Sequence, residues 1–368
     1  MALNKCKFLR VVNIVSSPQG GGAELLVREL HKIFQNKEID SKVIYSDSKV
    51  YDLDKNEIVI GCNPRSPLNI FYMRKIFKEI IKTSDEPLII HAHLTWPFFF
   101  TILALIGISD ANLIYTEHDT FNKRRLVPFS RFVERVFYRQ FKKIICISSG
   151  VEKSLTLWIG NNLSDKLITI PNGARIYKQV ERPLLKERKA KLISVGSLTK
   201  KKNFSTILKA IAYVKDEVES YTILGEGSER TSLEKLVIDL GLQEKVYLRG
   251  WCDSVESYLY DADIQLIPSL WEGFGLVAVE GLSTGIAVIG SNVPGLSEVL
   301  DRNVKAVTLI DEIESPIAWA NALENMIQMI RNDNQGLIAP AARQQAEKFS
   351  LERMADSYLQ VYREILSE

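Results

Sequence analysis

Two carboxylates, Glu272 and Glu280, flank a glycine turn in the stretch "WEGFGLVAVEGLSTG", residues 271–285. The apolar run that follows the turn predicts a helix beginning near Gly275. The backbone amides and the positive end of such a helix can hold a diphosphate. A glutamate five residues into the helix points back towards that end, and its carboxylate can accept two hydrogen bonds from the vicinal hydroxyls of a ribose. The alternative interpretation is a core segment that carries two acids.

A second glycine-rich stretch, Gly20–Gly22, leads from an apolar run into an amphipathic segment. Without side chains, the backbone N–H groups and a helix N-terminus can approach an anion. A tight turn between a strand and a helix explains the glycines equally well. The stretch lacks the G-x-G-x-x-G pattern and the lysine of a P-loop, which disfavours an NAD-type dinucleotide fold and an NTPase.

Histidines and lysines also follow candidate strands. His91 and His93 lie in "HAHL", and His118 lies in "TEHD". The segment "VGSLTKKKNF" supplies three consecutive lysines, residues 200–202, whose charges suit a phosphate. Satisfied polar groups and a solvated loop are the alternatives. No further cysteine or carboxylate set completes a metal-ligand spacing with the histidines.

The chain has 368 residues, enough for two ordinary domains, and its four scattered cysteines fit a reducing cytosol rather than a disulfide framework. No secretory signal is apparent. The longest apolar stretch, residues 96–108, is too short to span a bilayer and is typical of a buried helix. Residues 1–170 carry a net charge of +7 and the remainder a net of −5, so the two halves have different electrostatic tasks.

Short Val/Ile/Leu runs alternate with segments of helical period, which is typical of parallel strands buried on both faces. The sequence therefore predicts an α/β protein with two Rossmann-like, doubly wound parallel sheets facing across a cleft. The domains are residues 1–175, completed by a C-terminal helix at 351–368, and residues 190–350, joined by the charged stretch 175–191. The expected strands are "LRVVNIVSS", "KVIYS", "PLIIHAH", "NLIYTEH", "KIICIS", "KLITIP", "KLISVGS", "SYTILGEG", "KVYLRG", "DIQLIPS", "GIAVIGS" and "KAVTLI".

These pieces together resemble the retaining glycosyltransferases of the GT-B fold, group 1 (glycosyltransferase family 4). The stretch "EGFGLVAVE" at 272–280 matches the family's E-x7-E motif, and the resemblance covers almost the whole chain. The other matching pieces, in the family's order, are "GGAE" at 21–24, "HAH" at 91–93, "TEH" at 116–118, "IPNG" at 170–173, "VGSLTKKKN" at 195–203 and "GEG" at 225–227.

The resemblance implies roles for individual residues. Glu280 would bind the ribose hydroxyls of a nucleotide sugar, and Lys202 would contact the diphosphate. His118 would lie near the reacting sugar, and Gly21 and Gly22 would close on the donor from the N-terminal domain. The donor sugar and diphosphate would be held by Glu272 and by the backbone around Phe274, Gly275 and Leu276.

Two departures from the family pattern concern the donor site. Ser197 stands where the family usually has an arginine, so half of the expected cationic clamp is missing unless Lys200 or Lys201 replaces it. The stretch "PNGAR" lacks the aspartate that often follows "NG".

The resemblance implies retaining transfer of a sugar from a nucleotide-sugar donor to a glycan or lipid-linked acceptor. The expected pathway is bacterial surface polysaccharide biosynthesis: capsule, O-antigen or lipopolysaccharide. A nucleotide-sugar epimerase and a catalytically silent sugar-nucleotide-binding partner remain alternatives. We expect no metal, because "DAD" at 261–263 precedes a strand and lysine with helix-end amides can stabilise a departing diphosphate. We also expect no cofactor and no nucleic-acid partner.

The segment 121–143 holds eight Lys/Arg against one acid, Glu134. Its helical spacing predicts an apolar face for the core and a basic stripe on another side. We expect the basic side to rest on the anionic inner surface of the cytoplasmic membrane, with a cytoplasmic, peripheral enzyme; charges in water are the alternative. The apolar face comprises Phe129, Phe132, Val133, Val136, Phe137 and Phe141. The membrane-facing residues are Arg124, Arg125, Arg131 and Arg135, with Arg139 and Lys123 nearby.

Overall fold

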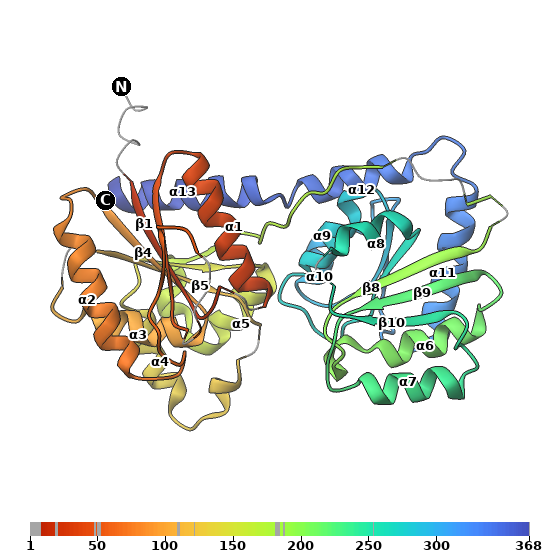
Figure 1. The fold of residues 1–368 in the computed structure, drawn as a ribbon, viewed down its shortest axis with the longest axis horizontal. Helices are drawn as coiled ribbons and strands as arrows, with labels where there is room; N and C mark the ends of the chain where they lie inside the picture. Colours follow the sequence, from red (N-terminus) through yellow and green to blue (C-terminus); the bar gives the residue numbers. More distant parts are fainter. Residues whose placement is uncertain are drawn as a thin grey trace. The chain divides into compact units, whose positions relative to one another are not determined.

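The computed structural model describes residues 9–18, 21–47, 49, 53–108, 111–120, 122–180, 185–186, 188–252 and 254–367, except for the side chain of Lys123. Gly20 and the Lys123 side chain, both named above, lie outside this description. The chain divides into two compact units, Met1–Gly173 with Leu351–Glu368, and Ala174–Ser350. The stretch predicted as a linker, 175–191, falls at the start of the second unit, and the C-terminal helix falls in the first (Figure 1).

The first unit is a seven-stranded parallel sheet in the order β3-β2-β1-β4-β5-β6-β7. Its strands are β1 Arg10–Val15, β2 Asp40–Tyr45, β3 Glu57–Val59, β4 Leu88–His93, β5 Asn112–Glu117, β6 Lys143–Cys146 and β7 Leu167–Thr169. Its helices are α1 Gly22–Asn36, α2 Leu68–Lys82, α3 Thr95–Leu105, α4 Ser130–Tyr138, α5 Ser149–Ile159 and α13 Leu351–Ser367, with 3-10 turns η2 Lys123–Leu126 and η3 Asn161–Lys166.

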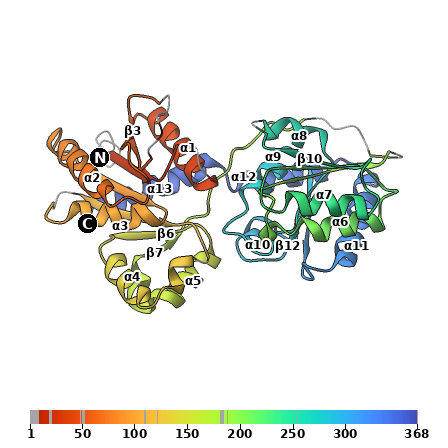
Figure 2. The ribbon, with the colours of Figure 1, turned by 60° about the horizontal axis from the view of Figure 1, so that its bottom comes forward.

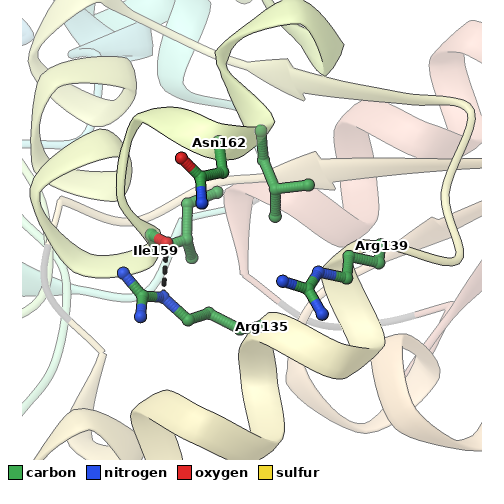
Figure 3. A pocket seen from close by; sticks show the side chains of 5 residues that line it. Arg135, Arg139, Ile159 and Asn162 are labelled. Carbon is green, nitrogen blue, oxygen red and sulfur yellow. Dashed lines mark hydrogen bonds between the residues drawn. The ribbon is translucent and has the colours of Figure 1, made fainter.

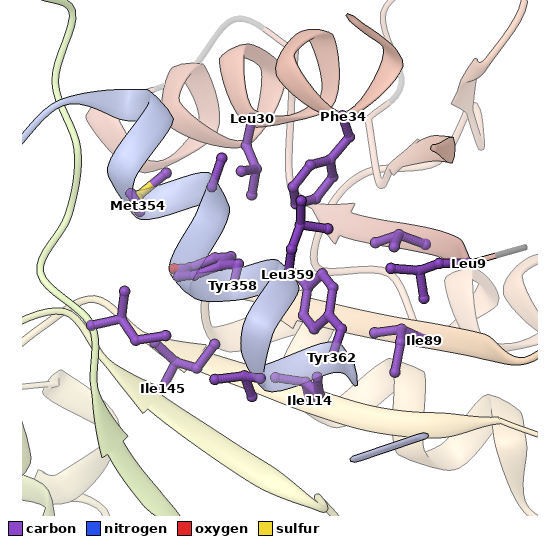
Figure 4. Close-up of a cluster of buried hydrophobic side chains, with 14 of the residues drawn as sticks. Leu9, Leu30, Phe34, Ile89, Ile114, Ile145, Met354, Tyr358, Leu359 and Tyr362 are labelled. Atoms are coloured by element: carbon purple, nitrogen blue, oxygen red, sulfur yellow. The ribbon is translucent and has the colours of Figure 1, made fainter. Parts of the chain in front are cut away.

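One face of this sheet is closed by α1 and α13. Tyr358 and Tyr362 of α13 pack with Leu30 and Phe34 of α1 over the sheet, as Figure 4 shows. The spacing of the apolar residues in α13 turns them to one face of the helix, so the end of the chain completes the core of the first unit.

The apolar stretch 96–108 forms most of α3. Phe98, Phe100 and Ala104 are buried against the sheet and its neighbours. Within the described residues no helix is both long and apolar enough to cross a membrane.

The second unit is a six-stranded parallel sheet in the order β10-β9-β8-β11-β12-β13. Its strands are β8 Ala190–Val195, β9 Val218–Leu224, β10 Val246–Gly250, β11 Ile264–Ile267, β12 Ala287–Ser291 and β13 Val307–Ile310. Its helices are α6 Phe204–Tyr213, α7 Arg230–Asp239, α8 Val255–Asp261, α9 Leu276–Ser283, α10 Leu296–Val299, α11 Pro316–Arg331 and α12 Ile338–Glu347, with the turn η4 Lys200–Lys202.

Both strand orders contain a switch point, where the chain reverses its direction across the sheet. It lies between β1 and β4 in the first unit and between β8 and β11 in the second. Ligands of open α/β sheets bind beyond the carboxyl ends of the strands at such points. The loops after β1, β4 and β5, and those after β8 and β11, are therefore the places to look for a site.

All twelve predicted strands are present, and all are parallel, which confirms the predicted fold class. The sequence analysis missed β3. This strand spans Glu57–Val59 at the edge of the sheet, is only partly buried, and its apolar run, residues 58–60, is only three residues long.

Candidate donor-binding site

A lysine–glutamate pair lies at the switch point of the second unit. Lys202, at the end of η4 after β8, places its Nζ 2.5 Å from Oε1 of Glu272, which follows β11. Ser269 donates a hydrogen bond to the same oxygen at 2.7 Å. The two neighbouring strands thus bring a cation and a carboxylate together at the edge where ligands bind.

The backbone explains how the lysine reaches the glutamate. The stem of Lys202 runs past Gly196, where a Cβ would lie 3.1 Å from its Cε. The Leu270 amide donates to the carbonyl of Lys201 at 2.8 Å, which joins the loop after β11 to η4. A side chain at position 196 would lie in tight contact with the lysine stem, so the glycine leaves room for Lys202 to reach Glu272.

Glu272 is ionised in this site. Burial by itself would raise the pKa of its carboxyl, but Lys202 and Lys201, with the hydrogen bonds from Lys202 and Ser269, hold that pKa below its ordinary value. Lys201 lies 3.8 Å from the other carboxylate oxygen. A carboxylate flanked by two cations can accept hydrogen bonds from hydroxyls while the cations remain available to an anion.

The glycine turn after Glu272 aims the start of α9. Gly275 precedes the helix with a φ of 96°, a left-handed conformation that favours glycine. A Cβ there would lie 2.8 Å from a methyl group of Leu296. Phe274 is buried and packs edge-on against Phe349. The first amides of α9, beginning with Leu276, therefore form the positive helix end that the sequence predicted near Glu272.

Glu280 lies within α9 and has a different environment. Burial raises the pKa of its carboxyl to about 7, and the nearby Arg175 opposes this shift. Its negative charge also contributes to the raised pKa of Tyr177, whose phenol is affected first by burial. The Tyr177 amide donates to Ser283 Oγ, which donates to the Glu280 carbonyl. The sequence analysis did not predict Arg175 and Tyr177 as neighbours of Glu280, because it interpreted "PNGAR" only as a departure from the family pattern.

Ser197, the other departure, is exposed in the loop after β8. The second cation near Glu272 comes instead from Lys201, whose Nζ also lies 6.0 Å from the ring centroid of Trp271. Lys200 is exposed on the same turn. Of the two lysines that the sequence offered as replacements for the arginine, Lys201 is the one beside the carboxylate.

The DAD motif precedes β11, so it lies at the amino ends of the strands, away from the carboxyl ends where ligands bind. Arg188 contacts both oxygens of Asp263 at 2.6 and 2.8 Å, and Lys191 contacts Asp261 at 2.8 Å. These aspartates serve ion pairs that join the start of β11 to the start of β8. Among the described residues no group of three or more His, Cys, Asp or Glu side chains could hold a metal ion.

In the first unit, Gly21 and Gly22 begin α1 at the switch point beside β4. Gly21 is the N-cap, and Glu24 turns its carboxylate back towards it. Burial raises the pKa of Glu24, whereas hydrogen bonds from its own amide and from that of Gly21 oppose the shift. The amides at this helix start therefore already hold a carboxylate.

His118 follows β5 and is almost fully buried. Its Nε2 lies 3.3 Å from Nδ1 of His93, the last residue of β4, and the other nitrogen of His93 lies 3.3 Å from Asn13 of β1. Burial lowers the pKa of His118 to about 4, so the ring is neutral at neutral pH. The three adjacent strands thus fix the orientation of one imidazole at the switch point.

His91 does not lie at this edge, contrary to the grouping of the three histidines in the sequence analysis. It is buried within β4, where its two nitrogens meet Tyr362 at 2.6 Å and Thr116 at 2.7 Å. Since Tyr362 belongs to α13, His91 attaches the C-terminal helix to the sheet.

The predicted basic stripe is not a free surface, and for Arg124 the prediction is wrong. Arg124 is largely buried, with Nη2 3.0 Å from Glu117 and Nε 2.8 Å from Glu134. Arg125 donates to the Thr120 carbonyl at 3.1 Å and to Ser154.

Arg131 and Arg135 are directed towards α5. Arg131 donates to the Trp158 carbonyl at 2.7 Å, and Arg135 donates to the Ile159 carbonyl at 2.5 Å. These carbonyls lie at the C-terminal end of α5, where a helix favours cations. The two arginines therefore help to join α4 to α5.

Four of the six residues of the predicted apolar face do not pack inward, so for these four that expectation is also wrong. Phe129, Phe132, Val133 and Val136 are all exposed, Phe129 to 87%. The inward side of α4 is formed by Glu134 and Tyr138, which are buried, while Phe137 and Phe141 pack on Phe98. The polar contacts of Glu134 and Tyr138 determine which side of the helix faces the protein.

Comparisons with known proteins identify the family of the chain. Residues 20–176 match the family model of Glycosyltransferase Family 4, and residues 177–344 match that of Glycosyl transferases group 1. An uncharacterized 41.2 kDa protein in the cps region of Klebsiella pneumoniae is 27% identical over 96% of this chain and 99% of its own. O-antigen chain mannosyltransferase RfbU of Salmonella typhimurium is 25% identical over 69% of this chain and 75% of its own.

Solved structures show the same fold. Sucrose-phosphate synthase of Thermosynechococcus elongatus superimposes with a TM-score of 0.80 at 18% identity, over 98% of this chain and 99% of its own. HepE of Anabaena, in complex with UDP and glucose, superimposes with a TM-score of 0.75 at 16% identity, over 97% of this chain and 100% of its own. With two family models that together span residues 20–344, and the GT-B fold of these structures, the chain belongs to the group 1 glycosyltransferases, glycosyltransferase family 4.

Proposed function

We propose that this glycosyltransferase moves a sugar, with retention of configuration, from a nucleotide-sugar donor to a glycan or lipid-linked acceptor. The observation that carries the proposal is the pairing of Lys202 with Glu272 at the switch point of the second unit, at the start of α9. A cation, a carboxylate and a helix end at one site match the charges of a diphosphate joined to a sugar.

Each part of the donor has a counterpart in the second unit. Lys202, Lys201 and the first amides of α9 bind the diphosphate. Glu272 is ionised and accepts hydrogen bonds from sugar hydroxyls. Glu280 accepts hydrogen bonds from the ribose hydroxyls, and Tyr177 lies beside it.

The chemistry follows from these charges. The bond between the anomeric carbon and the diphosphate oxygen breaks, and the acceptor hydroxyl forms a new bond to that carbon. The acceptor proton passes to the departing diphosphate on the same face of the sugar, which gives retention. Lys201, Lys202 and the helix-end amides stabilise the charge that develops on the leaving group, so we expect no metal to be needed.

The names of the relatives suggest a pathway. RfbU is described as an O-antigen chain mannosyltransferase, and the Klebsiella relative is encoded in a cps region. We therefore propose a role in bacterial surface polysaccharide biosynthesis, as in capsule, O-antigen or lipopolysaccharide assembly. A lipid-linked acceptor would be met at the inner face of the cytoplasmic membrane, so we propose an anionic membrane surface as a partner of the first unit.

A panel of nucleotide sugars tests the proposal, beginning with UDP-sugars because HepE was solved with UDP. Slow release of nucleoside diphosphate without acceptor is the expected result, since water replaces the acceptor. A new nucleotide sugar would identify an epimerase instead. If the protein binds a nucleotide sugar but turns over no member of the panel, even with added lipid-linked acceptor, it is a catalytically silent binding partner.

A further inference from the structure

The helix α4 exposes an apolar surface that no part of the described chain covers. We define this surface, the α4 apolar face, by the six exposed residues Leu126, Val127, Phe129, Phe132, Val133 and Val136. Phe129 and Phe132 are 87% and 74% exposed. Contiguous apolar surface of this kind marks an interaction site.

The packing of α4 explains why this surface is free. Glu134 pairs with Arg124 and accepts a hydrogen bond from Trp158 at 2.8 Å, and Tyr138 donates to Glu117 at 2.7 Å. These polar contacts hold the inward side of the helix. Phe132, Val133 and Val136 lie on the opposite side of α4, because residues three and four apart share one side of a helix, and the other three residues of the α4 apolar face precede the helix. Because its residues are exposed, the α4 apolar face adds little to the hydrophobic core of the first unit.

A row of arginines runs beside the α4 apolar face. Arg131, Arg135 and Arg139 are spaced four apart, one position before Phe132 and Val136 on the helix surface. Arg131 and Arg135 donate to backbone carbonyls at the C-terminal end of α5, whose partial negative charge offsets only part of the charge of the arginines. The single acid of the helix, Glu134, lies on the buried side and pairs with Arg124.

The positive charge continues beyond the helix. Arg135 and Arg139 both line a small hollow with Ile159, Asn162 and Leu163 (Figure 3). The neighbouring Lys143 and Lys166 also donate to backbone carbonyls, those of Asp165 and of Arg139 with Phe141. Figure 2 shows α4 and α5 side by side, below β6 and β7. The apolar surface is therefore bordered mainly by basic side chains, with the acid Asp165 beside Lys166.

We infer that the α4 apolar face docks in the headgroup and upper acyl region of an anionic lipid bilayer, with the arginine row against the lipid phosphates. An interfacial helix needs an apolar side, a cationic flank and no capacity to span the membrane. This one has all three. Two copies meeting through this face would bring their arginine rows together, which disfavours a dimer. The inference rests on the membrane partner proposed above. It adds that apolar side chains insert into the bilayer, where the sequence analysis expected only electrostatic contact with its surface.

The docking helix is joined to the candidate reaction site. Arg124 bridges Glu134 of α4 and Glu117, the residue before His118. Its guanidinium also lies over the ring of Phe98, 4.9 Å from the centroid. A membrane-bound α4 would therefore hold the strand that carries His118 at a fixed depth relative to a lipid-linked acceptor.

Sedimentation with lipid vesicles tests the inference without any donor or acceptor. The full chain should sediment at low salt with vesicles made of equal parts phosphatidylglycerol and phosphatidylcholine, and far less with phosphatidylcholine alone. Phe129→Ser with Phe132→Ser should lower the partition by about tenfold or more, because two large apolar groups no longer leave water. The matched control is Tyr213→Ser with Ile238→Ser, two exposed apolar residues on helices of the second unit, which should sediment like the wild type.

A reporter separates insertion from surface contact. The emission of an introduced tryptophan in Phe132→Trp, compared with the unsubstituted protein, should shift to the blue on anionic vesicles and be quenched by lipid-borne quenchers. Arg139→Gln should weaken sedimentation while leaving the fold intact, and added salt should weaken it further. All variants should release nucleotide from a nucleotide sugar at the wild-type rate, so failure of docking is distinguishable from failure of the proposed function.

Three results would overturn the inference. Wild-type protein that ignores anionic vesicles at low salt removes the membrane partner. A Phe129→Ser and Phe132→Ser variant that sediments like the wild type removes the α4 apolar face. A wild-type dimer that the same variant converts to a monomer assigns the face to a second copy of the chain.

Discussion

The ammonium of Lys202 and the carboxylate of Glu272 meet at 2.5 Å across the switch point of the second sheet. The two residues are 70 positions apart and come from the loops after β8 and β11. Breaking such a partly buried pair leaves a charge without a partner, so the pair holds the loops in place before any ligand arrives. A diphosphate entering the site shares the lysine with the glutamate and finds both groups already positioned.

Glu280→Gln should remove the pH dependence of nucleotide binding. The Glu280 carboxyl has a pKa of about 7, and the ionised form is the better acceptor for ribose hydroxyls. Nucleoside diphosphate affinity of the wild type should rise as pH increases through 7. The variant should bind about tenfold or more weakly above pH 7. Calorimetry on both proteins cancels the titration of the phosphate itself; parallel pH profiles would remove the ribose role.

The same variant should be more stable than the wild type at alkaline pH. The folded Glu280 carboxyl has a pKa of about 7, whereas the ordinary pKa of a glutamate is 4.5, so the folded state binds more protons between these pH values. Wild-type stability therefore falls as pH rises through this window, and the Gln variant escapes the loss. Thermal unfolding without ligand should show the gap above pH 7 and its closure towards pH 4.5.

Ser197→Arg tests whether Lys201 has replaced the missing arginine. If the cationic clamp is incomplete, arginine at this exposed position should tighten nucleoside diphosphate binding, most strongly at low salt. Because Lys201 already lies beside Glu272, we expect a gain of about threefold to tenfold rather than more. Ser197→Gln is the matched control for size. Weaker binding in the arginine variant would show that the lysines already fill the pocket.

His118→Ala and Glu272→Gln should each lower turnover more than nucleotide affinity. Both side chains are assigned to the sugar, and losing an interaction made mainly in the transition state lowers kcat. The expected loss is on the order of 100-fold in kcat. Since burial lowers the pKa of His118 to about 4, its ring should not contribute a titration to the rate above pH 5. Near-normal turnover at saturating donor in either variant would make that assignment wrong.

The fold was predictable because the buried strands appear in the sequence as short apolar runs. The sequence predicts the central strands of both sheets and the short edge strand β7, but it misses β3, a three-residue edge strand that is only partly buried. The segment 121–143 was misinterpreted for a physical reason. Periodicity identifies an apolar side, but buried contacts of Glu134 and Tyr138 with Arg124 and Glu117 decide which side faces inward.

The candidate site was predictable where neighbouring residues carry the signal. Glu272 and Glu280 share one motif, and the lysines of η4 share another. What the sequence does not contain is their meeting across the sheet, which needs the strand order β8-β11. Arg175 and Tyr177 lie near Glu280 from more than a hundred residues away in the chain, so only the folded chain places them there.

The most direct test of the donor site is a calorimetric titration of nucleoside diphosphates, in a chelating buffer, into the wild type and into Lys202→Met paired with Glu272→Gln. The paired substitution avoids a lone buried charge, so a folded protein is expected. The account predicts that the wild type binds one of the diphosphates without metal and that the double variant, folded by circular dichroism, binds it at least about tenfold more weakly. Equal binding by the two proteins, or wild-type binding that appears only after magnesium or manganese is added, would contradict it.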